Sequence, residues 1–153
     1  MCIVKFYTSC STVMAELQSR VSGTNGWSDP HNGGAYTLTS VSDGNPQMGI
    51  PGKITGQRVT GDDKYTDKFD FTFTGTGISD EPACNVSACS ESQVSSVVDY
   101  STNYCNLHSL YCTAKEGCPT SGKDTALYTY KETFSACSQH DDVCLASLVA
   151  TPT

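Results

Sequence analysis

Nine cysteines in 153 residues constrain the fold of this chain more than any other feature. Four of them lie in residues 84–112, spaced C-x4-C, then fifteen residues, then C-x6-C. A zinc site built from cysteine pairs needs two thiolates on one tight turn, as in C-x2-C. Among these four, Cys84 and Cys89 come nearest to that spacing, and no second pair follows at a suitable distance. The pattern therefore favours disulfides formed in an oxidising compartment over a metal site.

We expect four disulfides within the chain, each of which stabilises the fold by restricting the unfolded chain. An odd total leaves one cysteine free, capped or paired with a second chain. Cys2 and Cys10 flank a predicted terminal strand, so one of these two is the expected odd cysteine. The spacing leaves the pairing open. The cysteines predicted to form disulfides are Cys84, Cys89, Cys105, Cys112, Cys118, Cys137 and Cys144.

Hydrophobic residues make up 37% of the chain, which suits one β-rich domain, residues 1–153, stabilised by crosslinks. We predict an α+β fold with an antiparallel sheet of about five strands and two short helices; an all-β sandwich is the alternative. Phe69, Phe71 and Phe73 alternate with polar residues, which predicts a half-buried central strand. The strands are expected at 3–8, 35–41, 53–60, 68–74 and 126–137.

The two helices are predicted at residues 11–22 and 103–112. Ser11 or Thr12 can cap the first helix, and Asn103 can cap the second. The second helix is the clearer of the two, because its apolar face repeats at i, i+3, i+4 and i+7, at Tyr104, Leu107, His108 and Tyr111. A histidine on such a face is predicted to be a packed, hydrogen-bonded core residue rather than a ligand or a base.

The segment between Cys84 and the second helix allows two interpretations. Ser90 and Gln93 fit a capping box that opens a helix, whereas the β-branched residues that follow suit a strand. Asn85 begins the sequon N-V-S, which predicts N-glycosylation on an exposed loop and hence a glycoprotein.

The strings CSESQV and STNYCNLHSLYC, with GDDKYTDKFDFTFTGTG upstream, carry a resemblance. They are similar to a recurrent pattern in small secreted cysteine-rich proteins of unassigned function from fungi or oomycetes. The resemblance covers roughly residues 35–118. It implies an effector-like, virulence-associated or surface-associated extracellular protein, and it transfers no catalytic residue.

Charge and hydropathy indicate the compartment of the protein and limit the partners it can bind. The opening CIVKFYTSC is too short and polar for the apolar core of a signal peptide, so we expect a mature secreted chain whose Met1 was added for expression or left by processing. No run approaches the ~20 apolar residues of a membrane span. The net charge of −7 and the scattered basic residues disfavour nucleic acid as a partner.

The loop 23–34 is the predicted binding region, because binding residues concentrate on loops held by a rigid scaffold. In one interpretation Trp27, Asp29, His31 and Tyr36 form a recognition surface on which Trp27 is a stacking platform. In the other, Trp27 is buried as a plug over the sheet edge and His31 lies in solvent.

No GxSxG, HExxH or glycine-rich nucleotide motif occurs, so no catalytic residue and no cofactor are predicted. His140 beside Asp141 and Asp142 is interpreted as a solvated acidic turn, and no metal is expected. The predicted function is a secreted non-catalytic binding protein that recognises an extracellular protein or glycan, as a monomer or a dimer through the odd cysteine. One alternative is a protease inhibitor presenting TAKEGCPTSGKD. The other is a secreted ribonuclease using His31, His108, Glu132 and Arg58.

Overall fold

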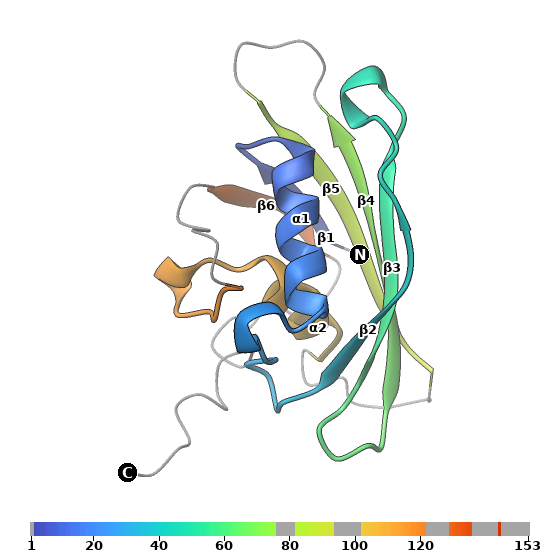
Figure 1. The fold of residues 1–153 in the computed structure, drawn as a ribbon, viewed down its shortest axis with the longest axis vertical. Helices are drawn as coiled ribbons and strands as arrows, with labels where there is room; N and C mark the ends of the chain where they lie inside the picture. Colours follow the sequence, from blue (N-terminus) through green and yellow to red (C-terminus); the bar gives the residue numbers. More distant parts are fainter. Residues whose placement is uncertain (1, 76–81, 94–101, 122–128, 136–143, 145–153) are drawn as a thin grey trace.

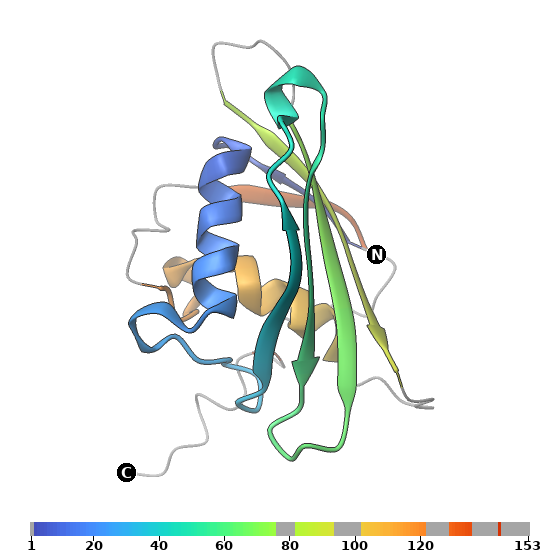
Figure 2. The ribbon, with the colours of Figure 1, turned by 45° about the vertical axis from the view of Figure 1, so that its right-hand side comes forward.

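The computed structural model describes residues 2–75, 82–93, 102–121, 129–135 and 144. The α+β prediction is confirmed: the described strands form one antiparallel sheet in the order β2-β3-β4-β5-β1-β6, and both α-helices lie on one face of it (Figures 1 and 2). The elements are β1 (Cys2–Phe6), α1 (Cys10–Val21), β2 (Ala35–Ser42), β3 (Gly52–Val59), β4 (Thr66–Gly75), β5 (Cys84–Ser92), α2 (Thr102–Tyr111) and β6 (Tyr130–Ser135).

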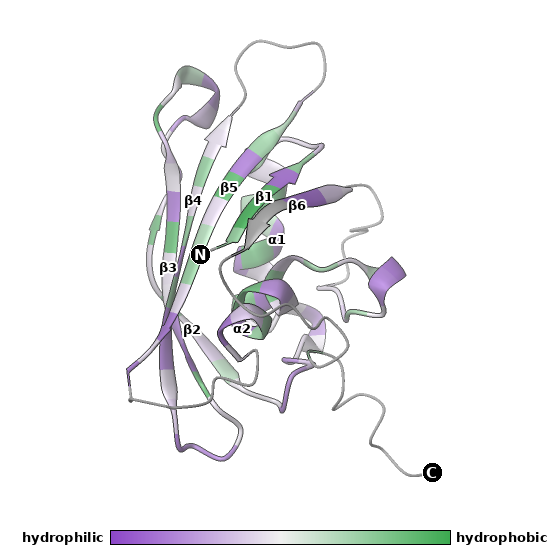
Figure 3. Cartoon of the chain, turned by 180° about the vertical axis from the view of Figure 1, so that it is seen from behind, coloured by the Kyte–Doolittle hydropathy of each residue, from purple (hydrophilic) through white to green (hydrophobic). Residues whose placement is uncertain are grey.

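Strand β4 forms the centre of the sheet, as its alternation predicts. Phe69, Phe71 and Phe73 are buried against the helices, while the residues between them are partly exposed on the open face. The same alternation of apolar and polar residues is visible along β4 and β5 in Figure 3. β4 pairs with β3 on one side and β5 on the other, so its apolar side supplies the middle of the core.

Helix α1 begins one residue before the predicted range, and its cap differs from the prediction. Ser9 is the N-cap, with extended backbone, and its Oγ accepts a hydrogen bond from the Thr12 amide at 3.3 Å. Ser11 and Thr12 therefore lie inside the first turn, because Cys10 already has helical geometry. The predicted apolar face is buried as expected, at Val13, Met14, Leu17 and Val21.

Strand β5 ends at Ser92, so it tests the capping box of the helix interpretation and not the β-branched residues that follow. Residues 84–92 are extended, so the Ser90–Gln93 capping box does not form, and the Gln93 amide donates to the Thr66 carbonyl instead. Pairing with β1 and with β4 gives this backbone hydrogen-bond partners on both sides, whereas a short surface helix would leave the groups of its first and last turns to solvent. Asn85 consequently lies on a strand rather than a loop, with its side chain exposed. Residues 94–101 lie outside the described part.

Three disulfides connect the described elements: Cys10–Cys84, Cys105–Cys144 and Cys112–Cys118. They contain five of the seven cysteines predicted to form disulfides, and Cys137 lies outside the described residues. One prediction is wrong, because Cys89 is a free thiol. Of the two candidates for the odd cysteine, Cys10 is bonded to Cys84 and Cys2 lies outside the three described disulfides. Cys89 cannot pair with Cys84, since it lies five positions away and residues an odd number apart face opposite sides of a strand.

Within the described ranges, no helix combines the length and the apolar character needed to cross a membrane.

Removing the Cys10–Cys84 disulfide is expected to destabilise the protein more than removing Cys112–Cys118. The first closes a loop with a sequence separation of 74, the second one of 6. The chain-entropy estimate gives about 4 kcal/mol for the first and about 2 kcal/mol for the second. Denaturant unfolding of the two double-serine variants measures the difference. Equal losses would contradict the ranking.

Candidate functional site

Trp27 is buried, which confirms the plug interpretation and overturns the stacking platform. The side chain is 8% exposed, and its indole Nε1 donates to the Pro119 carbonyl at 3.0 Å. Its ring meets the Tyr36 ring edge-on, with the centroids 5.8 Å apart. Trp27 therefore holds the loop 113–121 against the end of the sheet and offers no open face to a ligand.

The other three predicted binding residues lie around the buried side chain of Arg58. Arg58 Nη2 lies 2.6 Å from Asp29 Oδ2, and both side chains are fully buried. The same nitrogen donates to the His31 carbonyl at 2.6 Å, and the His31 amide donates to Asp29 Oδ1 at 3.0 Å. Half-buried Tyr36 donates its hydroxyl to the Asn106 carbonyl at 2.9 Å.

Gly34 shows how closely this cluster is packed, because a Cβ there would lie 2.5 Å from the Arg58 guanidinium carbon. The structure thus brings Asp29, the His31 backbone and Tyr36 together around Arg58, where these contacts hold the loop in place.

Replacing Trp27 with Ala is expected to lower the free energy of unfolding by about 3–5 kcal/mol, because a large buried ring leaves a cavity. Trp27→Phe keeps most of the ring and loses the bond to Pro119, so its loss should be smaller. Thermal melts of both variants test the burial. An unchanged midpoint for Trp27→Ala would contradict it.

His108 is packed in the core as predicted, between carboxylates and tyrosines. Its side chain is 2% exposed, and its Nδ1 lies 3.0 Å from the Tyr104 hydroxyl and 3.6 Å from Glu132 Oε1. On the opposite side of the ring, Nε2 lies 3.7 Å from Glu116 Oε1. Tyr104 and Tyr111 both donate to Glu132. This cluster connects α2 to β6 and to the loop after α2.

The contacts in this cluster shift the pKa values of Glu132 and Tyr111. Burial alone would raise the pKa of Glu132, but hydrogen bonds from His108, Tyr111 and Tyr104 outweigh it and lower that pKa below the ordinary glutamate value. Burial, reinforced by the Glu132 carboxylate, raises the pKa of Tyr111 well above its usual value. Glu132 is therefore held as an anion by neutral phenol donors, which is a stable arrangement inside a protein.

The proposed ribonuclease set is not assembled. His108 and Glu132 meet, whereas Arg58 and His31 lie in the separate cluster beneath the loop 27–34. A general acid or base must reach the substrate, and His108 has both ring nitrogens against protein groups.

His108, Cys112 and Cys118 are the one group of potential metal ligands within the described ranges, with their donor atoms within 4.8 Å of one another. Both sulfurs belong to a disulfide, so no thiolate is present to bind an ion. Residues 140–142 lie outside the described part.

Two further predictions concern the surface. The inhibitor candidate is braced by Cys112–Cys118, but residues 114–116 form a short 3₁₀ turn rather than an extended segment, and residues 122–124 lie outside the described part. Asn85 is the second residue of β5 and is exposed between buried Cys84 and Val86, so its side chain points to the face of the sheet opposite the helices. Its glycosylation stays a prediction, which the intact mass after secretion from a eukaryotic host would test.

Stability is expected to fall in acid because of Glu132. A carboxyl with a lowered folded pKa stabilises the protein above its ordinary pKa, near 4.5, and this contribution is lost as the pH falls through the folded value. Glu132→Gln should therefore reduce the slope of unfolding free energy against pH below about 4.5. The exposed Glu91→Gln serves as the control. Identical slopes in the wild type and Glu132→Gln would contradict the assignment.

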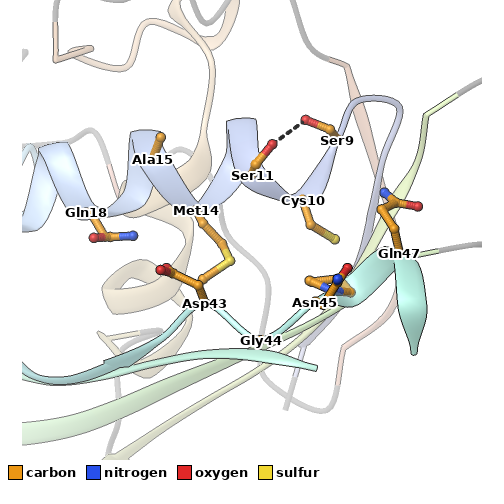
Figure 4. A pocket seen from close by; sticks show the side chains of 11 residues that line it. Ser9, Cys10, Ser11, Met14, Ala15, Gln18, Asp43, Gly44, Asn45 and Gln47 are labelled. Atoms are coloured by element: carbon orange, nitrogen blue, oxygen red, sulfur yellow. Dashed lines mark hydrogen bonds between the residues drawn. The ribbon is translucent and has the colours of Figure 1, made fainter. Parts of the chain in front are cut away.

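A cleft lies between α1 and the turn that follows β2 (Figure 4). This turn is at the end of the sheet away from α2 (Figure 1). We call the cleft the α1–hairpin cleft; its volume is about 430 Å³ and its lining is mostly apolar. Met14 and Asp43 face each other across it in Figure 4. It is lined by residues 9–11, 14, 15 and 18 on one side and residues 43–47 on the other.

The turn that forms the outer wall of the cleft is held by its own backbone. Asn45 and Ile50 exchange two hydrogen bonds, of 2.8 and 3.0 Å. Gly44 has φ +58°, and a Cβ there would lie 2.3 Å from the Pro51 carbonyl oxygen, so glycine is required. Gly52 leaves room for Met14, whose sulfur lies 2.9 Å from where a Cβ would stand. The cleft is thus preformed rather than created by a mobile loop.

Apolar side chains are exposed beside the cleft. Met48 is 76% exposed, Ile50 59% and Val41 40%. Sequence reasoning missed this site, although methionine and isoleucine inside the polar, glycine-rich run SDGNPQMGIPG were a signal of it. Exposed apolar groups that cluster on a soluble protein mark interaction surfaces. The α1–hairpin cleft is therefore the candidate functional site.

Comparisons of this chain with protein-family models, with curated proteins and with solved structures found no match.

Proposed function

We propose that this chain is a secreted, effector-like protein that binds a segment of an extracellular protein in the α1–hairpin cleft and catalyses no reaction. The observation that carries the proposal is the preformed, mostly apolar cleft of about 430 Å³ with exposed apolar side chains beside it. Concave, apolar sites with a few polar groups are where proteins take ligand side chains. Three disulfides support an extracellular setting, and the effector-like character depends on the resemblance of residues 35–118.

The chemistry of the lining favours binding over catalysis. Asp43 is the one ionisable residue that lines the cleft, since Cys10 is bonded to Cys84. Acid–base catalysis needs a second positioned group, and none of the lining residues supplies it.

The lining also favours a protein over a glycan. Sugar rings are commonly held by stacking on aromatic side chains, but no aromatic residue lines the cleft and Trp27 is buried elsewhere. The lining instead includes the apolar Met14 and Ala15 on α1, together with amide and hydroxyl side chains. This combination suits one apolar side chain of a peptide segment whose backbone contacts the rim.

Selection of random twelve-residue peptides displayed on phage against the oxidised protein tests the proposal. Synthetic copies of the recovered peptides are expected to bind the wild type and to bind Ala15→Phe at least about tenfold more weakly, because the added ring occupies the space of an anchoring side chain. Fluorescence polarisation measures the affinities.

Ser19→Phe is the matched control, since it adds the same ring to α1 outside the cleft lining. Thermal melts confirm that both variants fold. Recovery of no peptide, or equal binding to wild type and Ala15→Phe, would refute the proposed function.

A further inference from the structure

Strand β2 has a free edge beside the cleft. It is the terminal strand of the sheet, and among the described strands it pairs with β3 alone. An edge strand presents a row of backbone N–H and C=O groups that can pair with another strand. Proteins usually protect such edges with charged residues, proline, shortness or bulges.

The two edges of the sheet differ in this protection. β6, at the opposite edge, has six residues and includes the charged Lys131 and Glu132. β2 has eight residues, AYTLTSVS, with no charged residue and no proline. Its one protective feature is a register shift between Leu38 and Ser40. The β2 edge is therefore the less protected of the two against an added strand.

The β2 edge is continuous with the α1–hairpin cleft. Ser42 ends β2, and Asp43, the next residue, already lines the cleft. Alternate side chains of a strand point to the same face of its sheet, so a strand added beside β2 would direct every second side chain toward the helix face. Val41, which is 40% exposed, lies at the junction of edge and cleft. One extended segment could thus pair with β2 and place an apolar side chain in the cleft.

The charges of the chain indicate which kind of segment can pair with β2 and enter the cleft. Two copies of this chain, each with a net charge of −7, repel each other, which disfavours pairing of β2 with β2 of a second copy. Asp43 lines the cleft, and no lysine or arginine does. A segment with a basic residue next to its apolar anchor complements this rim.

We propose that β2 binds an extended segment of a partner protein as an added antiparallel or parallel strand, with a bulky apolar side chain in the α1–hairpin cleft and a basic residue near Asp43. This inference rests on the proposed function, because it takes the cleft as the anchor site. Main-chain hydrogen bonds then supply affinity, and the cleft supplies specificity.

The test uses a peptide recovered in the selection above, together with analogues in which single amides are replaced by esters. In an added strand only every second N–H faces β2. Esters at the positions whose N–H faces β2 are therefore expected to weaken binding by about tenfold each. Esters at the positions in between, whose N–H faces away from β2, are expected to weaken binding much less. Hydrogen exchange of the protein, followed by NMR, is expected to slow in residues 35–42 on binding. Residues 130–135, on the other edge, are the internal control.

The outcomes separate the two proposals. Binding that Ala15→Phe weakens, without a difference between the two sets of esters and without protection of β2, leaves the proposed function intact and refutes the added strand. Binding that Ala15→Phe does not change refutes both, whatever happens at β2. Protection of β2 that grows with protein concentration in the absence of peptide, with a dimer in sedimentation, identifies a second copy as the occupant and also refutes the inference.

Discussion

The Cys10–Cys84 disulfide is the constraint on which the position of α1, and therefore the cleft, depends. It joins the first residue of α1 to the first residue of β5, across a sequence separation of 74. Cys10 itself lines the cleft, and Met14, one turn later, packs closely over Gly52. A covalent bond at the start of the helix and a close contact one turn further on prevent α1 from sliding over the sheet. The wall of the cleft is thus fixed from within the core.

Two buried arginines fix the opposite end of the molecule. Arg20 bonds to Glu16 at 2.9 Å and donates to the Ser109 carbonyl of α2, and Arg58 bonds to Asp29 and to the His31 carbonyl. Burying such pairs costs desolvation, so their net contribution to stability is small, although removing one partner is costly. Each guanidinium also bonds to the main chain of a separate segment. Their effect is to specify which segments lie together, with α1 held to α2 and the loop 27–34 held to β3.

The predictions that succeeded depend on local pattern, and those that failed depend on distant partners. The alternation of Phe69, Phe71 and Phe73 and the helical face of α2 can be recognised from neighbouring residues alone. β5 could not be assigned, because its extended form is stabilised by β1 and β4, which lie far away in the sequence. Once β5 is a strand, the odd spacing of Cys84 and Cys89 already shows that they face opposite sides.

The cleft could not be predicted from the sequence, because it too depends on residues that lie far apart in the chain. Its two walls, in α1 and in the turn 43–47, are distant in the sequence and meet where the disulfide fixes α1 on the sheet and Met14 packs over Gly52. The sequence showed the apolar residues in the turn but gave no reason to connect them with a helix some thirty positions earlier. Trp27 is a similar case, since its burial depends on Pro119.

The distribution of stabilising contacts explains why the hairpin end can remain apolar and exposed. The disulfides of α2 and the buried ion pair of Arg58 with Asp29 lie at the end of the sheet opposite the β2–β3 turn. A chain with only 37% hydrophobic residues has few to spare, yet Val41, Met48 and Ile50 stay at the surface. The net charge of −7 favours solubility despite them. Because crosslinks elsewhere stabilise the fold, these side chains are not needed in the core, and the proposed contact with a partner would account for their position beside the cleft.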